Sequence, residues 1–199
     1  MMTLEELEQD ALKRNIPVMQ KEGILFLIEQ LQERKATSCL EIGSAIGYSA
    51  MMMTTHVEHL CVETIELDEQ RYLEAVGHIH EHGLEKRITI HHDDALTFQT
   101  DKLQFAPYDC LFIDAAKAQY QKFFEKYMPL VADEGICIVD NLDFHGMIFD
   151  IDNIKNRNTK QLVKKIKRFK DWIFDNELYD VEYHHVGDGI CVIRKRVAQ

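Results

Sequence analysis

Short β-rich runs alternate with longer stretches whose apolar residues recur at helical spacing, and this alternation limits the possible folds more than any other feature of the sequence. Strands that alternate with helices are joined by right-handed crossovers into a mainly parallel sheet. Five such strands are predicted, at residues 38–43, 59–66, 87–91, 108–114 and 135–140. Helices are predicted between them, at residues 48–56, 68–82 and 120–131.

The two ends of the chain depart from this alternation. Two helical stretches, residues 4–14 and 17–34, precede the first strand and make up an N-terminal helical extension over residues 1–36. After the fifth strand, an irregular stretch leads to a helix predicted at about residues 159–176.

The last two β-rich runs, residues 179–186 and 189–197, are joined by the tight turn Gly187-Asp188-Gly189. Such a turn favours an antiparallel hairpin. The sequence therefore predicts one α/β domain over residues 1–199. Its seven-stranded, Rossmann-like sheet is mostly parallel, ends in an antiparallel hairpin and carries helices on both faces.

Composition is consistent with a folded domain that needs no membrane. Hydrophobic residues make up 46% of the chain and there are only 3 Pro, so a sizeable core is expected. Apolar runs such as residues 23–28 are far shorter than the ~18 residues that a bilayer requires. The acidic N-terminus has no secretory signal. We therefore expect a cytoplasmic protein without a membrane partner.

The five cysteines lie in apolar runs, and no two of them form a C-x-x-C pair. Buried thiols behave as small hydrophobic groups, so neither disulfides nor a zinc site is predicted.

Charge is distributed very unevenly. The formal net charge is −11, which by itself argues against nucleic acid as a partner. However, residues 155–170 contain eight basic residues and no acid. The other 15 of the 23 basic residues share the rest of the chain with all 34 acids. One basic segment thus stands out from an acidic protein.

A glycine turn follows the first predicted strand, in Glu41-Ile-Gly43-Ser-Ala-Ile-Gly47-Tyr48-Ser49. Ligands of open α/β sheets bind at the carboxyl ends of the strands, and glycines there let the backbone approach a ligand closely. The spacing matches neither the dinucleotide G-x-G-x-x-G motif nor a phosphate-binding loop with its Lys. An ordinary strand-to-helix turn is the alternative interpretation.

Acidic residues follow the second and third strands. Glu66 stands about 20 residues after the glycine turn, where an acid can accept hydrogen bonds from ribose hydroxyls. Asp94, in Asp93-Asp94-Ala95, could accept a hydrogen bond from an adenine amino group. The alternatives are a solvated acid for Glu66 and helix N-capping for Asp94.

The fourth and fifth strands end in Asp114-Ala-Ala-Lys117 and in Asp140-Asn141. Adjacent parallel strands would bring Asp114, Asp140 and Asn141 to one edge of the sheet. Their oxygen atoms suit a hard cation such as Mg²⁺, and Lys117 is close enough to act as a base. Turn chemistry is the alternative, because Asp and Asn are common where strands end.

Together these motifs resemble the cation-dependent class I O-methyltransferases related to catechol O-methyltransferase. The resemblance extends over nearly the whole chain, from Pro17-Val-Met19 to the final hairpin. It implies a class I methyltransferase fold in which S-adenosylmethionine lies over strands one to three. One departure is visible, because Asp93 stands where many relatives have Gly.

The resemblance also implies roles for individual residues. The cofactor-binding residues would be Met19, Glu41, Gly43, Tyr48, Ser49, Glu66, Asp94, Ala95 and Asp114. The ligands of Mg²⁺ or another divalent cation would be Asp114, Asp140 and Asn141, and the catalytic residues would be Lys117, as the base, and Asp114.

Within that family, the stretch from Asp140 to Leu162 and the ending Val186-Gly187-Asp188-Gly189 most resemble the bacterial tRNA 5-hydroxyuridine methyltransferases. Those enzymes methylate the 5-hydroxyl of the wobble uridine to give 5-methoxyuridine. The resemblance implies tRNA as the partner and, because relatives are often dimers, a homodimer. The basic segment is consistent with tRNA, since phosphates need clustered Lys and Arg.

The predicted RNA contacts are Lys164, Lys165, Lys167 and Arg168. The alternative interpretation of the segment is a solvated amphipathic helix. A small catechol-like or phenolic molecule is the alternative acceptor. A non-catalytic nucleotide-binding module is a third possibility, but it would lack the metal acids or Lys117, and all of these are present.

Overall fold

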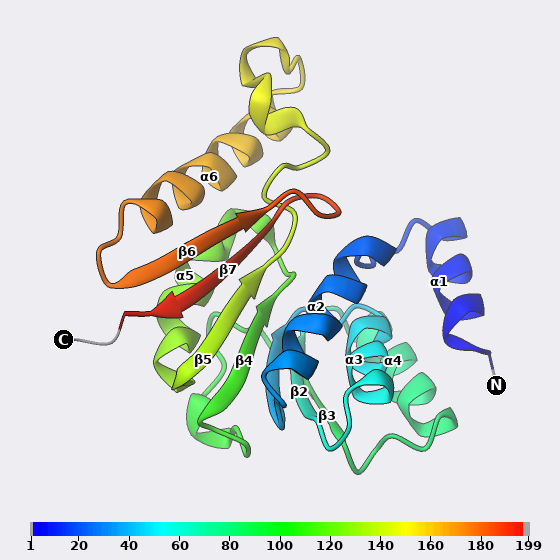
Figure 1. Cartoon of the computed structure of the whole chain (residues 1–199). Helices are drawn as coiled ribbons and strands as arrows, with labels where there is room; N and C mark the ends of the chain where they lie inside the picture. The colour runs from blue at the N-terminus through cyan, green and yellow to red at the C-terminus, as the bar shows by residue number, and fades with distance from the viewer. Residues whose placement is uncertain (1, 197–199) are drawn as a thin grey trace.

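A computed structural model describes residues 2–196, and its centre is a seven-stranded sheet of order β3-β2-β1-β4-β5-β7-β6 (Figure 1). The strands are β1 (Ser38–Ile42), β2 (Cys61–Glu66), β3 (Ile88–His92), β4 (Tyr108–Ile113), β5 (Val131–Val139), β6 (Tyr179–His184) and β7 (Ile190–Lys195). The first five are parallel, whereas β7 runs antiparallel to both β5 and β6. The predicted mostly parallel sheet with a closing hairpin is therefore confirmed.

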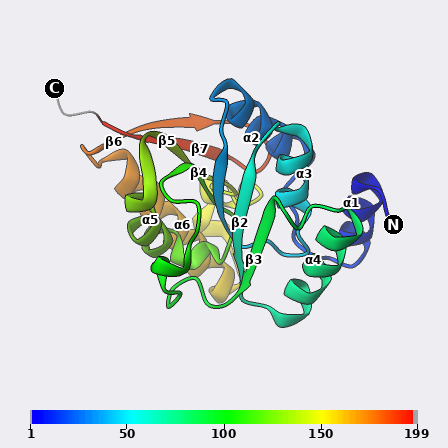
Figure 2. The same cartoon turned by 90° about the horizontal axis from the view of Figure 1, so that it is seen from below.

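Helices cover both faces of the sheet, as predicted (Figure 2). They are α1 (Leu4–Lys13), α2 (Lys21–Glu33), α3 (Tyr48–His56), α4 (Glu69–Glu81), α5 (Tyr120–Tyr127) and α6 (Arg157–Phe174). Short 3-10 helices are η1 (Thr100–Lys102), η2 (Lys117–Gln119), η3 (Met128–Leu130), η4 (Met147–Phe149) and η5 (Ile151–Asn153). The first four α-helices pack on one face and the last two on the other.

Three predicted boundaries were wrong by four residues each. They are the end of the helix expected at 120–131, the start of the strand expected at 135–140 and the start of the helix expected at 17–34. The helix expected at 120–131 ends at Tyr127, because Pro129 favours a 3-10 turn there and β5 already begins at Val131. The second helix begins at Lys21 rather than residue 17. The other boundaries agree to within one or two residues, apart from Val197, which lies outside the described residues.

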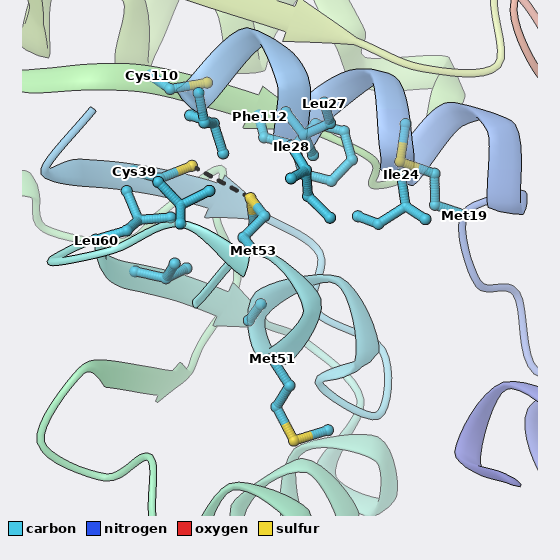
Figure 3. Packing of buried hydrophobic residues seen from close by; sticks show 14 of the residues in the cluster. Met19, Ile24, Leu27, Ile28, Cys39, Met51, Met53, Leu60, Cys110 and Phe112 are labelled. Carbon is cyan, nitrogen blue, oxygen red and sulfur yellow. Dashed lines mark hydrogen bonds between the residues drawn. The ribbon is translucent and has the colours of Figure 1, made fainter. Parts of the chain in front are cut away.

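Both faces of the sheet are apolar, which explains the nearly continuous hydrophobic strands. On one face, α2 and α3 pack over β1 and β4 (Figure 3). The Cys39 Sγ atom there lies 3.9 Å from Met53 Sδ. Hydrogen bonding to Cys110 and burial raise the pKa of the Cys39 thiol, so it stays protonated. All five cysteines are free, as expected.

The other face is covered by α5 and α6. The helix α6 begins where the Asn156 side chain accepts a hydrogen bond from Thr159 N–H at 3.0 Å. Its buried residues recur at helical spacing and face the sheet: Val163, Ile166, Phe169 and Ile173. The amphipathic helix expected from the basic segment is therefore present. Among residues 2–196, no helix is both long enough and apolar enough to cross a membrane.

A buried carboxylate joins the middle of the sheet to the loop before β4. Glu63 is fully buried, and its Oε1 atom lies 2.8 Å from His91 Nε2. Its Oε2 atom accepts hydrogen bonds from Tyr108 Oη at 2.5 Å and from Gln104 N–H at 3.0 Å. Burial alone raises the pKa of Glu63, but these hydrogen bonds outweigh it, so the pKa lies below its ordinary value.

We expect Glu63→Gln to lower the free energy of unfolding by about 1–3 kcal/mol at pH 7, because buried donors lose a charged acceptor. Because the pKa of Glu63 is lowered in the folded state, its ionised carboxylate stabilises the folded protein fully at pH values above the ordinary pKa of 4.5. That contribution is lost as the pH falls through the lowered value. Urea unfolding at pH 7 and pH 3.5 checks whether the difference between the two proteins narrows.

The matched control is Glu58→Gln, because the Glu58 side chain is 87% exposed. We expect this change to leave the free energy of unfolding nearly unaltered at either pH. A Glu63 variant as stable as the control at pH 7 contradicts the proposed role of the network.

Candidate active site

A cavity of about 850 Å³ lies at the carboxyl ends of β1, β2, β3 and β4. Nine of the residues predicted to bind a cofactor or to act in catalysis line it: Met19, Gly43, Tyr48, Ser49, Glu66, Asp94, Ala95, Asp114 and Lys117. The extended segment before α2 supplies Pro17, Val18 and Met19 as one wall. Because α2 begins only at Lys21, residues 17–19 stay outside the helix and can form this wall.

The floor of the cavity requires a glycine. Gly43 has φ +93°, and a Cβ atom there would lie 2.8 Å from the Asp114 carbonyl oxygen. Gly47, with φ +84°, is the N-cap of α3. These two residues let the backbone turn sharply under the cavity. The glycine motif therefore shapes the cavity and does not only connect β1 to α3.

Glu41 lies beneath this turn and does not line the cavity. It is fully buried, and its Oε1 atom accepts a hydrogen bond from the hydroxyl of Ser49. Its Oε2 atom is buried without a hydrogen-bond partner among residues 2–196. Burial raises the pKa of Glu41 to about 7. Glu41 thus reaches a ligand in the cavity only through Ser49, which does line it.

Glu66 is held with its carboxylate in a set orientation. The Oε2 atom accepts a hydrogen bond from Ala45 N–H at 2.8 Å, and the Oε1 atom accepts one from Asp68 N–H at 2.9 Å. The carboxylate is nearly buried but lines the cavity. Each oxygen retains a lone pair for a further donor, which is what binding a pair of ribose hydroxyls requires.

Asp94 forms a turn and not a helix cap. Its Oδ1 atom accepts a hydrogen bond from Leu96 N–H at 2.8 Å, and no helix begins there. From α5, Lys126 Nζ donates to the Ala95 and Phe98 carbonyls at 2.9 and 2.7 Å, while Tyr127 Oη donates to Ala95 at 2.6 Å. Two side chains of one helix therefore hold the backbone that directly follows Asp94 in the predicted adenine loop.

The predicted metal residues and the predicted base meet at one edge of the sheet. Lys117 Nζ donates to Asn141 Oδ1 and lies 3.9 Å from Asp114 Oδ1. Asp140 Oδ1 accepts a hydrogen bond from Asn141 N–H at 2.7 Å. Burial raises the pKa of Asp114 to about 6 although Lys117 opposes the shift. Burial and the charge of Asp114 raise the pKa of Asp140 to about 7.

At this edge Asp140 is buried. It is only 2% exposed, and the Tyr120 hydroxyl donates to its carbonyl oxygen at 2.9 Å. Neither Asp140 nor Asn141 lines the main cavity. Among residues 2–196, no three His, Cys, Asp or Glu side chains are placed to hold a metal by themselves. Two carboxylates and one amide would need water or acceptor oxygens to complete a coordination shell.

The four predicted RNA contacts are all exposed on α6. They are not equivalent, however. Lys167 Nζ lies 2.9 Å from both carboxylate oxygens of Asp171, one turn further along the helix. Lys165 and Arg168 line a separate groove beside Lys117.

Asp188 is a residue whose role in this region the sequence did not indicate. It was predicted only as part of a hairpin turn, yet it is 5% exposed and its Oδ1 atom accepts a hydrogen bond from His145 N–H at 2.5 Å. The chain runs through left-handed backbone at Phe144, His145 and Gly146. Phe144 lines the cavity. The hairpin turn thus supports the loop that follows the predicted metal residues, and no local motif signals this contact.

We expect Asp188→Ala to loosen this loop, because the partly buried His145 N–H would lose its acceptor at a point of unfavourable backbone conformation. The free energy of unfolding should fall by about 1–3 kcal/mol. Hydrogen exchange should show faster exchange at residues 144–146 than in the unaltered protein. Asp188→Asn keeps an oxygen acceptor and should restore much of the protection; equal protection in all three proteins contradicts the assignment.

Comparisons with known proteins agree with this geometry. A protein-family model described as O-methyltransferase matches residues 1–196. A crystal structure from Staphylococcus aureus, provisionally named a caffeoyl-CoA O-methyltransferase, is 31% identical, with a TM-score of 0.93 over 98% of this chain and 93% of that one.

Two further relatives are more distant. The O-methyltransferase from Bacillus cereus, solved in complex with SAH, is 24% identical and shares the fold, with a TM-score of 0.81 over 97% of this chain and 90% of that one. The catechol O-methyltransferase of Niastella koreensis is 26% identical over 159 residues, which are 78% of this chain and 69% of that protein. The chain therefore belongs to the O-methyltransferase family and is an S-adenosylmethionine-dependent O-methyltransferase.

Proposed function

We propose that this methyltransferase uses Mg²⁺ or another divalent cation and methylates the 5-hydroxyl of 5-hydroxyuridine at the wobble position of tRNA, giving 5-methoxyuridine. The observation that carries the proposal is one arrangement of side chains. Asp114, Asp140 and Asn141 gather around Lys117 at the edge of the cavity, and two exposed cations of α6, Lys165 and Arg168, line the groove that also includes Lys117.

The cavity suits S-adenosylmethionine as the methyl donor. Because Gly43 has no Cβ atom, its backbone could approach the methionine portion closely. Ser49 presents a hydroxyl that Glu41 orients, and Glu66 presents a fixed carboxylate for the ribose. Bound there, S-adenosylmethionine would supply a methyl group that its positively charged sulfur already activates. Asp94 and Ala95 would border the adenine.

The donor set beside the cavity suits a hard divalent cation. Asp114 and Asp140 are two carboxylates whose charges disfavour each other, and both are largely buried. A cation between them would relieve that repulsion, and the Asn141 amide adds a neutral oxygen. A Mg²⁺ ion held by these residues would lower the pKa of an enolic or phenolic hydroxyl and orient it.

Lys117 is the proposed base. Its Nζ atom lies within 3.9 Å of Asp114 and donates to Asn141, so it occupies the same edge as the proposed acceptor hydroxyl. There its amine, in the neutral form, would accept the hydroxyl proton as the oxygen attacks the methyl group. The walls of the cavity would hold oxygen and methyl group at reacting distance.

The tRNA acceptor is supported by two features. The hydroxyl of 5-hydroxyuridine is enolic and has a carbonyl beside it, so it offers two neighbouring oxygens, as a catechol does. The basic residues on α6 suit phosphates, which a free phenol lacks. The resemblance of residues 140–162 to bacterial tRNA 5-hydroxyuridine methyltransferases points the same way. The homodimer and the cytoplasmic location stay predictions.

A small catechol-like or phenolic acceptor is the second candidate. It is favoured by the names of two similar proteins, a catechol O-methyltransferase and a provisionally named caffeoyl-CoA O-methyltransferase. The proposed metal residues and base would serve such a phenol equally well. The two candidates differ in whether groups outside the reacting ring are recognised.

We expect Asp140→Asn and Asn141→Gly each to lose divalent-cation binding and to lower turnover more than about 100-fold, because a ligand of the proposed ion is removed. Glycine is chosen at Asn141 because its φ is +61°, which alanine disfavours. Electron paramagnetic resonance of added Mn²⁺ measures cation binding without any acceptor. Titration calorimetry should show nearly unchanged S-adenosylmethionine binding in both variants and in EDTA.

The control is Asp133→Asn, at a side chain that is 95% exposed on β5. It should bind Mn²⁺ as the unaltered protein does. Full Mn²⁺ binding by the Asp140 or Asn141 variant would exclude the proposed coordination. Loss of S-adenosylmethionine binding in EDTA would show that the cofactor and metal sites are not separate.

We expect tRNA from a strain without this gene to accumulate 5-hydroxyuridine and to lack 5-methoxyuridine, because the proposed reaction consumes the first nucleoside and forms the second. Nucleoside mass spectrometry measures both. The purified protein with S-adenosylmethionine and Mg²⁺ should then convert 5-hydroxyuridine in that tRNA. An unchanged nucleoside profile together with rapid methylation of a catechol would favour the second candidate.

A further inference from the structure

A second groove of about 470 Å³ adjoins the active-site cavity and is lined by residues of η2, α5 and α6. The two hollows share Lys117 and Ala118. Four cationic side chains line the groove, Lys117, Lys122, Lys165 and Arg168, against one acid, Glu125. This is a local excess of positive charge in a chain whose formal net charge is −11.

Some basic residues of α6 form ion pairs within the chain, whereas others, Arg157 and Lys164 among them, form none with residues 2–196. Lys160, Lys167 and Lys170 each face an acid of the chain, at 3.9 Å from Asp152, 2.9 Å from Asp171 and 3.6 Å from Asp143. By contrast, Lys165 and Arg168 form no ion pair or side-chain hydrogen bond with any residue from 2 to 196, and neither does Lys122 on α5. The unpaired cations that line the groove therefore come from both of its walls.

Helical geometry places Lys165 and Arg168 on the same side of α6, since they are three residues apart. The buried Tyr120 of α5 and Phe169 of α6 also line the groove, and their ring centroids lie 5.6 Å apart. The single acid, Glu125, accepts a hydrogen bond from Gln121 at 2.8 Å. The groove thus has an aromatic floor and positively charged walls.

We propose that Lys122, Lys165 and Arg168 bind a phosphate group of the acceptor while the acceptor hydroxyl lies beside Lys117. The inference rests on the proposed function, in which this phosphate belongs to the RNA strand next to the methylated nucleotide. Arg provides a planar set of donors that matches phosphate oxygens, and Lys adds compact charge. The phosphates of a coenzyme A thioester have the same chemistry, so the test includes that source.

The test compares two variants that each remove two positive charges from exposed positions. The groove variant is Lys165→Gln/Arg168→Gln, and the control variant is Lys13→Gln/Lys86→Gln, at residues that do not line the groove. Lys122→Gln examines the opposite wall, and Lys117 is left unchanged because it belongs to the proposed catalytic group. Thermal unfolding should show that all three variants fold as the unaltered protein does.

Three probes separate phosphate recognition from recognition of the base. They are free 5-hydroxyuridine, 5-hydroxyuridine 3′,5′-bisphosphate and tRNA that contains 5-hydroxyuridine. Binding of each is measured by titration at several salt concentrations, so no turnover is required. Coenzyme A is titrated in parallel as the other phosphate source.

The groove variant should bind the bisphosphate and tRNA about 10-fold or more weakly, since a hydrogen bond to a charged group is lost with each change. Its plot of log K against log salt should flatten by about one to two units, and Lys122→Gln should act in the same direction. The control variant should bind both ligands with an affinity within about twofold of that of the unaltered protein, because its changes lie outside the groove. Free 5-hydroxyuridine should bind all four proteins equally.

Equal losses in the groove and control variants would overturn the proposal, because they would reflect general charge and not this groove. Unchanged bisphosphate binding in the groove variant would overturn it as well, even if tRNA is methylated. Groove-dependent binding of coenzyme A, with no binding of bisphosphate or tRNA, would support the phosphate site but reject RNA as its source. That result would count against the proposed function and not against the groove.

Discussion

The close approach of two backbone segments, after β1 and after β4, is the contact on which the site depends. The two strands are parallel neighbours, with Ile42 opposite Ile113, and Asp114 N–H donates to the Ile42 carbonyl at 3.1 Å. A Cβ atom at Gly43 would lie 2.8 Å from the Asp114 carbonyl oxygen. Only glycine therefore lets the floor of the cavity and the aspartate of the predicted metal site share one edge of the sheet.

Electrostatics gives that edge its chemical character. Asp114 and Asp140 are carboxylates in surroundings that disfavour their charge, and Lys117 is the cation placed beside them. Asp188 adds a further acid nearby, whose charge acts on both. Such a group of acids is costly to keep together unless cations or hydrogen-bond donors compensate it. The hairpin turn does not line the cavity. It supports the site indirectly, because Asp188 accepts a hydrogen bond from His145 in the loop after Asn141.

The helix α6 shows how one amphipathic segment serves two purposes. Its apolar side, including Ile166 and Phe169, completes the core on one face of the sheet. Its basic residues differ in their surroundings. Lys167 forms an ion pair with Asp171, whereas Lys165 and Arg168 line a groove in which four cationic side chains outnumber the one acid, Glu125. A solvated helix and a phosphate-binding surface are thus compatible, since they use different residues of the same basic segment.

Hydrophobic periodicity and turn residues determined the strands, most of the helices and the hairpin, because these depend on neighbours in the chain. The same pattern placed Gly43, Glu66, Asp114 and Asp140 after successive strands, hence at one edge of a parallel sheet. Tertiary structure alone decided that Glu41 acts behind Ser49, that Asp140 is buried, and that Asp188 supports His145. It also placed Lys122 of α5 in the same groove as Lys165 and Arg168 of α6. These relations join segments far apart in sequence, and their distances depend on strand register and helix packing, which no local pattern encodes.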